Sequence, residues 1–236
     1  MKVCVLQPDY SPSTVDYRLY DPPRDLTPLL PEHQVDHVAL NKLTTFRQMK
    51  DLAQQGYDIF VNLCEGYPDW DVPSIDVIYA FEQLNLPYTG PPPHLYDVPK
   101  KVMKYVAYSA GVGTPAHVLV RTLSDLDGIE KKLRYPLFVK PAHAGDSRGI
   151  DETSLVTDPA RLPQQVAKEL VEFPEVLVEE YIDGREFTVL VSAGSEGNGQ
   201  CDVYNPVEYI FPPGPHFKTY AMKTSDLHPS ANIPVR

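Results

Sequence analysis

Short apolar runs alternate with amphipathic stretches over residues 1–90. Residues 2–6, Lys-Val-Cys-Val-Leu, are typical of a buried strand, while residues 74–84 have helical spacing with Ser74 as N-cap and Asp76 in the first turn. This alternation predicts a small parallel sheet covered by helices. The expected strands span 2–6, 33–40, 57–63 and 86–90, and the expected helices span 41–55, ending at Gly56, and 74–84.

A stiff connection follows, because residues 91–93 are three successive prolines. We expect residues 91–99 to link two domains. Beyond it, the same patterns predict a second set of elements, with Ser124 as the N-cap of one helix. The expected helices span 100–109, 123–133 and 158–172, and the expected strands span 117–120, 135–140, 176–179, 186–192 and 202–211, the last two paired.

Composition narrows the function classes. The net charge of −11 and the pI near 5.0 argue against a nucleic-acid-binding surface, which is usually basic. The three cysteines show no metal-ligand spacing, and Cys4 and Cys64 lie in apolar runs, so we expect buried thiols. No signal peptide or membrane-spanning stretch is evident, so a cytoplasmic protein without membrane contact is the expectation.

A strand ending in a lysine carries the first candidate chemistry. The apolar run from Tyr135 ends at Lys140, and a small-residue loop over 142–149 follows. An ammonium supplies a point charge, and Gly145 and Gly149 let backbone N–H groups approach phosphate oxygens closely. The alternative is a solvated lysine at the end of a strand.

A second strand ends in carboxylates. Strand alternation sends Val176 and Val178 to one face and Leu177 and Glu179 to the other. A carboxylate there, followed by an extended backbone run, suits an amine-bearing ring and a ribose.

These two strands resemble the ATP-grasp superfamily and, within it, the D-alanine–D-alanine ligases and related carboxylate–amine ligases. The matching pieces are Phe-Val-Lys-Pro with its Ala-Gly-Asp-Ser-Arg-Gly loop, and Val-Glu-Glu-Tyr-Ile-Asp-Gly-Arg-Glu-Phe-Thr-Val, which is the more specific. The resemblance implies an α/β protein in which a parallel pre-ATP-grasp domain (1–90) precedes an incomplete α+β ATP-grasp domain. The latter would comprise a nucleotide-binding subdomain (100–185) and a partial C-terminal subdomain (186–236).

The resemblance also implies roles for single residues. Lys100, Lys140 and Lys223 would hold phosphates beside the loop serine Ser147; Glu179 would accept from the adenine amino group, Tyr181 and Ile182 would form the hinge, and Glu186 would accept from the ribose. Lys104 matches a second helix lysine of the family. Solvated lysines and an exposed strand carboxylate remain the alternatives for Lys100 and Glu186.

In the first domain, Glu65 and the loop after Leu6 would face a small amino-acid or carboxylate substrate. This chain departs from the family there, because Gln-Pro-Asp-Tyr-Ser-Pro-Ser replaces a Gly-Gly-x-Ser-x-Glu stretch. The substrate is therefore left open, and Glu65 is alternatively an exposed turn carboxylate.

The implied activity is ATP-dependent amide formation through an acyl phosphate, with Mg²⁺. The family's catalytic arginine and magnesium ligands have no counterpart up to Arg236, so we expect this chain alone to be inactive. Two hypotheses remain open: a fragment of a ligase, or a truncated ATP-binding protein without catalysis. A third treats the motifs as coincidence in a structural α/β domain. Exposed edge strands would favour a homodimer or poor solubility.

Overall fold

A computed structural model describes residues 1–13, 21–66, 68, 70–194, 200–211 and 217–224. The chain divides into two compact units, Met1–Tyr96 and Asp97–Arg236. The division falls inside the stretch predicted as a linker. In the described part of the chain, no helix combines the length and the apolar character needed to cross a bilayer.

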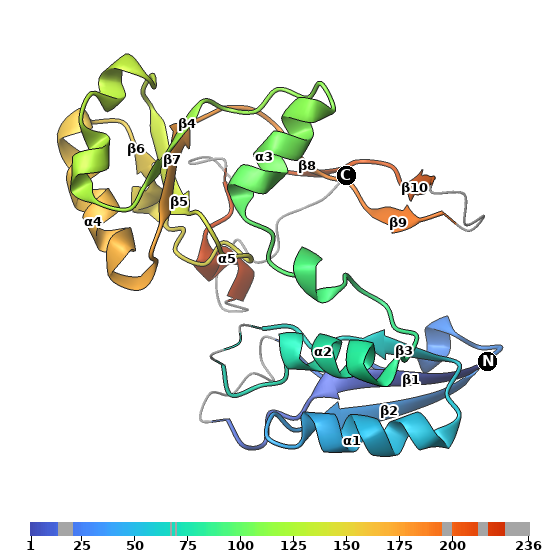
Figure 1. Ribbon diagram of the computed structural model, residues 1–236. Coiled ribbons are helices and arrows are strands. Elements are labelled where there is room, and N and C mark those ends of the chain that lie inside the picture. Colours follow the sequence, from blue (N-terminus) through green and yellow to red (C-terminus); the bar gives the residue numbers. More distant parts are fainter. Residues whose placement is uncertain (14–20, 67, 69, 195–199, 212–216, 225–236) are drawn as a thin grey trace. The chain divides into compact units, whose positions relative to one another are not determined.

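The first unit is built on a three-stranded parallel sheet in the order β2–β1–β3. Helices α1 and α2 lie on the same side of this sheet (Figure 1), and the predicted parallel sheet with covering helices is confirmed. The elements are β1 (Lys2–Pro8), β2 (Gln34–Leu40), α1 (Thr45–Leu52), β3 (Ile59–Asn62) and α2 (Ile75–Leu84), with 3-10 turns at Thr27–Leu29, Ala53–Gln55 and Pro93–Leu95.

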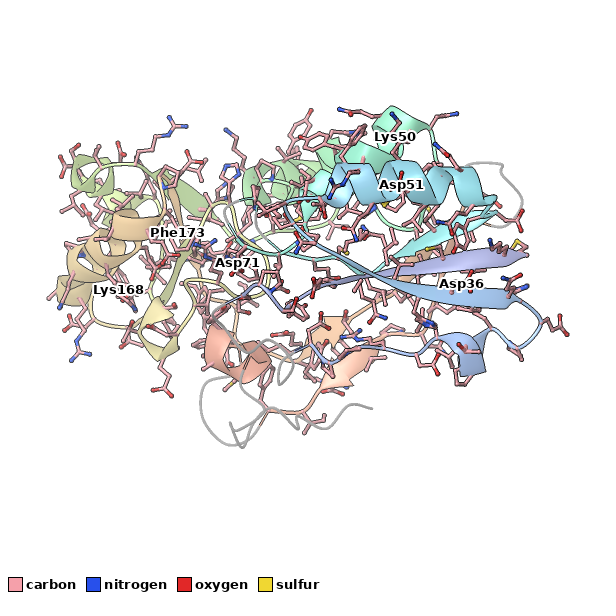
Figure 2. All side chains as sticks on the ribbon, turned by 90° about the horizontal axis from the view of Figure 1, so that it is seen from below. Asp36, Lys50, Asp51, Asp71, Lys168 and Phe173 are labelled. Atoms are coloured by element: carbon pink, nitrogen blue, oxygen red, sulfur yellow. The ribbon has the colours of Figure 1, made fainter. Side chains whose placement is uncertain are left out.

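The core of this unit forms where the sheet meets the two helices. Cys4 and Leu6 are two positions apart on β1, so both side chains face the helices, where they pack with Phe60 and Phe81. On the outer side of α1, Lys50 and Asp51 are exposed (Figure 2). The expected burial of the thiols is confirmed for Cys4 and for Cys64, and burial raises the pKa of Cys4 to about 11.

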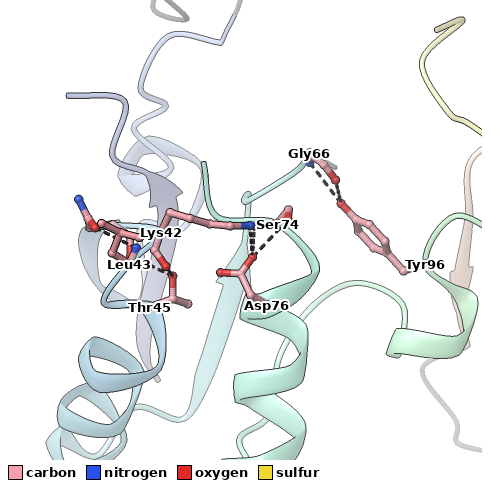
Figure 3. A network of polar contacts seen from close by, with 8 residues as sticks. Lys42, Leu43, Thr45, Gly66, Ser74, Asp76 and Tyr96 are labelled. Carbon is pink, nitrogen blue, oxygen red and sulfur yellow. Dashed lines mark hydrogen bonds and ion pairs between the residues drawn. The ribbon is translucent and has the colours of Figure 1, made fainter. Parts of the chain in front are cut away.

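Polar contacts fix the loops above this core (Figure 3). The predicted N-cap position of Ser74 is confirmed, but its side chain does not cap the helix; instead its backbone N–H donates to Asp76 Oδ1 at 2.8 Å. Lys42 Nζ lies 2.8 Å from the same oxygen. The Tyr96 hydroxyl donates to the Gly66 carbonyl at 2.6 Å, so the end of the unit is tied to the loop after β3.

The second unit contains an antiparallel four-stranded sheet in the order β4–β7–β5–β6. Val139 and Val178 from the sheet pack against Leu162 and Val166 of α4 in one buried cluster. The elements are α3 (Lys100–Ser109), β4 (His117–Val120), β5 (Leu137–Pro141), β6 (Leu155–Val156), α4 (Leu162–Glu172), β7 (Val176–Glu180) and α5 (Tyr220–Thr224), with 3-10 turns at Glu152–Ser154 and Pro159–Arg161.

Two shorter antiparallel pairs follow this sheet. Strand β8 (Glu186–Thr188) pairs with β11 (Val207–Tyr209), and β9 (Val191–Ala193) pairs with β10 (Cys201–Val203). The predicted pairing is confirmed, but each predicted long strand is divided into two. Pro206 lies at the break and has no N–H to donate to a continuous ladder.

Three other sequence predictions are wrong. The helix expected over 123–133 is a pair of 3-10 turns, Leu123–Leu126 and Ile129–Lys131, because Gly128 between them has a φ of 70°. Thr122, and not Ser124, is the cap of the first turn. The strand expected over 86–90 is reduced to a single bridge between Phe60 and Tyr88.

Candidate functional site

A cavity of about 340 Å³ lies in the second unit. It brings together side chains from α3, β5, β7, β8 and the loop after β5. Its lining includes seven residues singled out from the sequence: Lys100, Lys140, Ser147, Glu179, Tyr181, Ile182 and Glu186. Lys100, Lys140 and Glu179, which are distant from one another along the chain, therefore line the same cavity.

Two other predicted residues are not among the described side chains that line this cavity. Glu65 belongs to the first unit and is exposed after β3. The backbone of Lys223 lies in the short helix α5, whereas its side chain is outside the described residues. The roles predicted for these two residues stay predictions.

The two strands named from the sequence are direct neighbours. Phe138 on β5 is opposite Glu179 on β7, and Lys140 is opposite Leu177, so alternation puts Lys140 and Glu179 on one face. Lys140 Nζ forms an ion pair with Glu179 Oε1. Lys140 is thus held by a carboxylate beside the cavity and is not a solvated lysine at the end of a strand.

A second lysine contacts the same carboxylate from the neighbouring helix. Lys104 Nζ lies 2.7 Å from Glu179 Oε2 and donates to the Pro115 carbonyl at 3.0 Å. The side chains of Lys104 and Glu179 are only 11% and 9% exposed. Burial raises the pKa of Glu179, but Lys140 and Lys104 more than offset this, so the net shift is downward and the carboxylate stays ionised.

The third lysine, Lys100, joins the helix to the loop. Its backbone N–H donates to the Ala142 carbonyl at 3.1 Å, and its Nζ donates to the Ala144 carbonyl at 2.7 Å. Burial, followed by the positive charge of Lys140, lowers the pKa of Lys100 to about 8. An anion entering the cavity would raise this pKa again and stabilise the charged amine.

The segment after β7 corresponds to the predicted hinge. The N–H groups of Glu180 and Tyr181 donate to the carbonyls of Ala116 and Pro136, each at 3.0 Å. The backbone N–H of Tyr181 is therefore committed to the protein, and its ring packs against Phe138 with 6.0 Å between centroids. Ile182 is exposed at the cavity, so the hinge residues differ in what they can offer a ligand.

Glycine at the end of the loop over 142–149 allows it to pack closely. Gly149 has a φ of 76°, and a Cβ there would lie 2.6 Å from Pro141 Cγ and 2.9 Å from the ring of Phe173. Phe173 follows α4 and is labelled in Figure 2. The guanidinium of Arg148 bonds Glu172 at 2.7 Å, and these contacts hold Ser147 at the cavity.

Several lining residues were not found from the sequence: Pro115, Phe138, Ile150, Glu180, Phe217 and Lys218. Strand alternation could have placed Phe138 on the face of Lys140. Phe217 packs edge-on against Phe138 with 4.9 Å between centroids. Lys218 lies over the ring of Tyr209, a position that no local sequence pattern indicates.

The cation and carboxylate set fits a nucleotide, because lysines suit phosphates and carboxylates suit donors on a base and a ribose. The described residues contain no group of three or more His, Cys, Asp or Glu that could hold a metal ion. The expected Mg²⁺ stays a prediction.

Comparison with known families places residues 114–236 within the family model described as D-ala D-ala ligase C-terminus. The match covers more than half of the 236 residues. It includes β5, the loop after it, and β7.

Curated relatives are similar in sequence to this chain over most of its length. The protein y4sG of Sinorhizobium fredii, described as uncharacterized, is 34% identical over 183 residues, which are 74% of this chain and 49% of that protein. A D-alanine–D-alanine ligase of Bordetella petrii is 33% identical over 175 residues, 72% of this chain and 50% of that protein. The matched region thus spans about half the length of these relatives.

Solved structures share the fold. A D-alanine–D-alanine ligase from Bacillus anthracis complexed with ATP has a TM-score of 0.63 at 18% identity, covering 91% of this chain and 67% of that one. The VanG D-Ala:D-Ser ligase of Enterococcus faecalis has a TM-score of 0.60 at 17% identity, covering 89% and 69%. The expected fold class is confirmed.

The packing of Gly149 gives a stability prediction. Gly149→Ala should destabilise the protein by about 1–3 kcal/mol more than Gly128→Ala, because only the first adds a methyl group to a closely packed site. Gly128 is the matched control, since its φ is 70° and an added Cβ would meet nothing within 4 Å. Urea unfolding of both variants measures the difference, and equal stabilities would show that the loop can shift away freely.

Proposed function

Because this chain belongs to the D-alanine–D-alanine ligase family of ATP-grasp proteins, we propose that its second unit is the ATP-binding part of a carboxylate–amine ligase. The observation that carries the proposal is the single cavity that contains both Lys140 and Glu179 with Lys100 beside them. The lysines supply the positive charge that the phosphates of an adenine nucleotide require, and the carboxylate accepts hydrogen bonds from the donors of the adenosine part.

The proposed contacts divide by chemistry. Lys100 and Lys140 donate to phosphate oxygens, and Ser147 contributes a hydroxyl from the loop. Glu179 accepts from the exocyclic amine of adenine, and the backbone of Ile182, which is an exposed residue, meets the ring edge. Glu186 accepts from ribose hydroxyls. Tyr181 contributes its ring to the wall, since its N–H is used by Pro136.

When bound, ATP supplies the phosphoryl group that activates a carboxylate toward an amine. The role of the cavity residues of this chain is to hold and orient the phosphates. Lys100 and Lys140 offset the repulsion among phosphate oxygens. Phe138 and Phe217 give the cavity an apolar wall that limits water.

The amine and carboxylate are proposed to be small amino acids. D-alanine is the first to test, since it appears in the names of the relatives. Glu65 and the loop after β1 remain the proposed substrate-facing residues. The Gln-Pro-Asp-Tyr-Ser-Pro-Ser stretch in that loop favours a substrate preference different from that of typical family members.

Removal of one cavity lysine should weaken nucleotide binding. Lys140→Met keeps the length of the side chain but removes its charge, so the affinity for ATP should fall about 10- to 100-fold. Lys131→Met is the matched control, because Lys131 is exposed in the same unit and does not line the cavity. Calorimetry measures both, and unchanged ATP affinity in Lys140→Met would contradict the proposed phosphate contact.

The affinity for ATP should depend on pH through Lys100. Its pKa of about 8 means that the amine is charged below this pH and loses its charge above it. ATP binding should therefore be strongest below pH 8, weaken as the pH rises to 9.5, and take up protons in that range. In Lys100→Arg this pH dependence should disappear, because arginine stays charged. A flat wild-type profile would count against Lys100.

Turnover is tested by phosphate release with D-alanine and a panel of other amino acids. The ligase proposal expects release that needs both ATP and an amino acid, and that is reduced in Lys140→Met. Saturation with ATP but no release with any amino acid would instead identify this chain as an ATP-binding protein without turnover.

A further inference from the structure

Glu179 is held by two lysines that differ in their surroundings. Lys140 lines the cavity and is 21% exposed. Lys104 does not line it, is 11% exposed, and is anchored by its bond to the Pro115 carbonyl just before β4. One counterion of Glu179 can therefore be reached by a ligand, whereas the other is part of the framework.

A nucleotide changes these two contacts unequally. Phosphates attract Lys140, and a lysine that turns toward them leaves Glu179 Oε1 open to another donor. Lys104 keeps its contacts with Glu179 Oε2 and with Pro115, because both lie within the protein. A buried carboxylate without any counterion would take up a proton. Lys104 is thus the partner that remains when Lys140 has moved.

We propose that Lys104 is a positioning residue that keeps Glu179 ionised and oriented while ATP is bound, and that it thereby sets the preference for adenine over guanine. The inference rests on the proposed function, in which Glu179 accepts from the base. Lys104 acts through Glu179 and does not itself touch the nucleotide.

The base preference follows from donors and acceptors. An ionised carboxylate only accepts hydrogen bonds, so it matches the 6-amino group of adenine and repels the 6-oxo group of guanine. A protonated carboxyl group has an O–H and can donate to that oxo group. Loss of Lys104 should therefore relax the preference, and more so at low pH.

Other charged groups near Glu179 define what the pH test must control. Lys140 contacts it from β5, Lys104 contacts it from α3, and the charge of Lys100 also acts on it. His117 is its cross-strand partner on β4. His117→Gln is therefore included, so that titration of an imidazole is separated from protonation of the carboxylate.

The experiment compares the affinities for ATP and GTP by calorimetry at pH 6, 7 and 8. Wild type should prefer ATP at every pH. In Lys104→Met the ratio of the two affinities should fall about tenfold or more, and it should fall furthest at pH 6. Lys104→Arg should restore the ratio, because it retains the charge. Lys101→Met, which removes an exposed lysine of the same helix, should leave the ratio unchanged.

If Lys104→Met alone does not fold, the double variant Lys104→Met with Glu179→Gln keeps the test informative. The double variant also removes the negative charge of Glu179, so no unpaired buried charge remains. Glu179→Gln needs no counterion, so adding Lys104→Met to it should cause no further change in the ratio of affinities. A further loss of selectivity in the double variant would show that Lys104 acts by another route and would overturn the inference.

The outcomes separate the two proposals. If wild type binds neither nucleotide, the proposed function fails. If wild type prefers ATP and folded Lys104→Met keeps the same preference at every pH, only the role of Lys104 fails. Equal weakening of ATP and GTP binding would indicate a general structural role for Lys104 and would also overturn the inference.

Discussion

The carboxylate of Glu179 between Lys104 and Lys140 is the interaction on which the site depends. It joins β7 to α3 through one oxygen and to β5 through the other. A buried ion pair stabilises a structure only when each charge has good partners, and a single uncompensated charge is strongly destabilising. Because Glu179 has two lysine partners, one of them can respond to a ligand without leaving the carboxylate unpaired.

The loop after β5 is held by different forces. Its end fits closely because Gly149 has no side chain where Pro141 and Phe173 approach. Arg148 bonds Glu172 and also lies 5.5 Å above the Phe173 ring. Its start is held by Lys100, which bonds the carbonyls of Ala142 and Ala144. The lysines and the packing of the loop together define one side of the cavity.

Local sequence patterns predicted the structure correctly where the alternation of apolar and charged residues decided which side chains are buried. Alternation on β7 correctly separated Val178, in the core, from Glu179, on the side of the cavity. The same patterns failed where turn geometry decided the outcome. Asp125 accepts from the backbone of Arg121 and Thr122, and this bonding, with Gly128 after it, favours two short turns over one helix.

The sequence by itself determined the order of the elements and the parallel sheet of the first unit, because these depend on spacing along the chain. Seven cavity residues were named beforehand because their motifs resemble those of the ATP-grasp family. Only the tertiary structure decided which partners those residues have. Lys104 on α3 and Glu179 on β7 are far apart in sequence, and only folding brings their side chains into contact. For the same reason Phe217 and Lys218 were not found beforehand, since neither forms part of a local pattern and both reach the cavity only through folding.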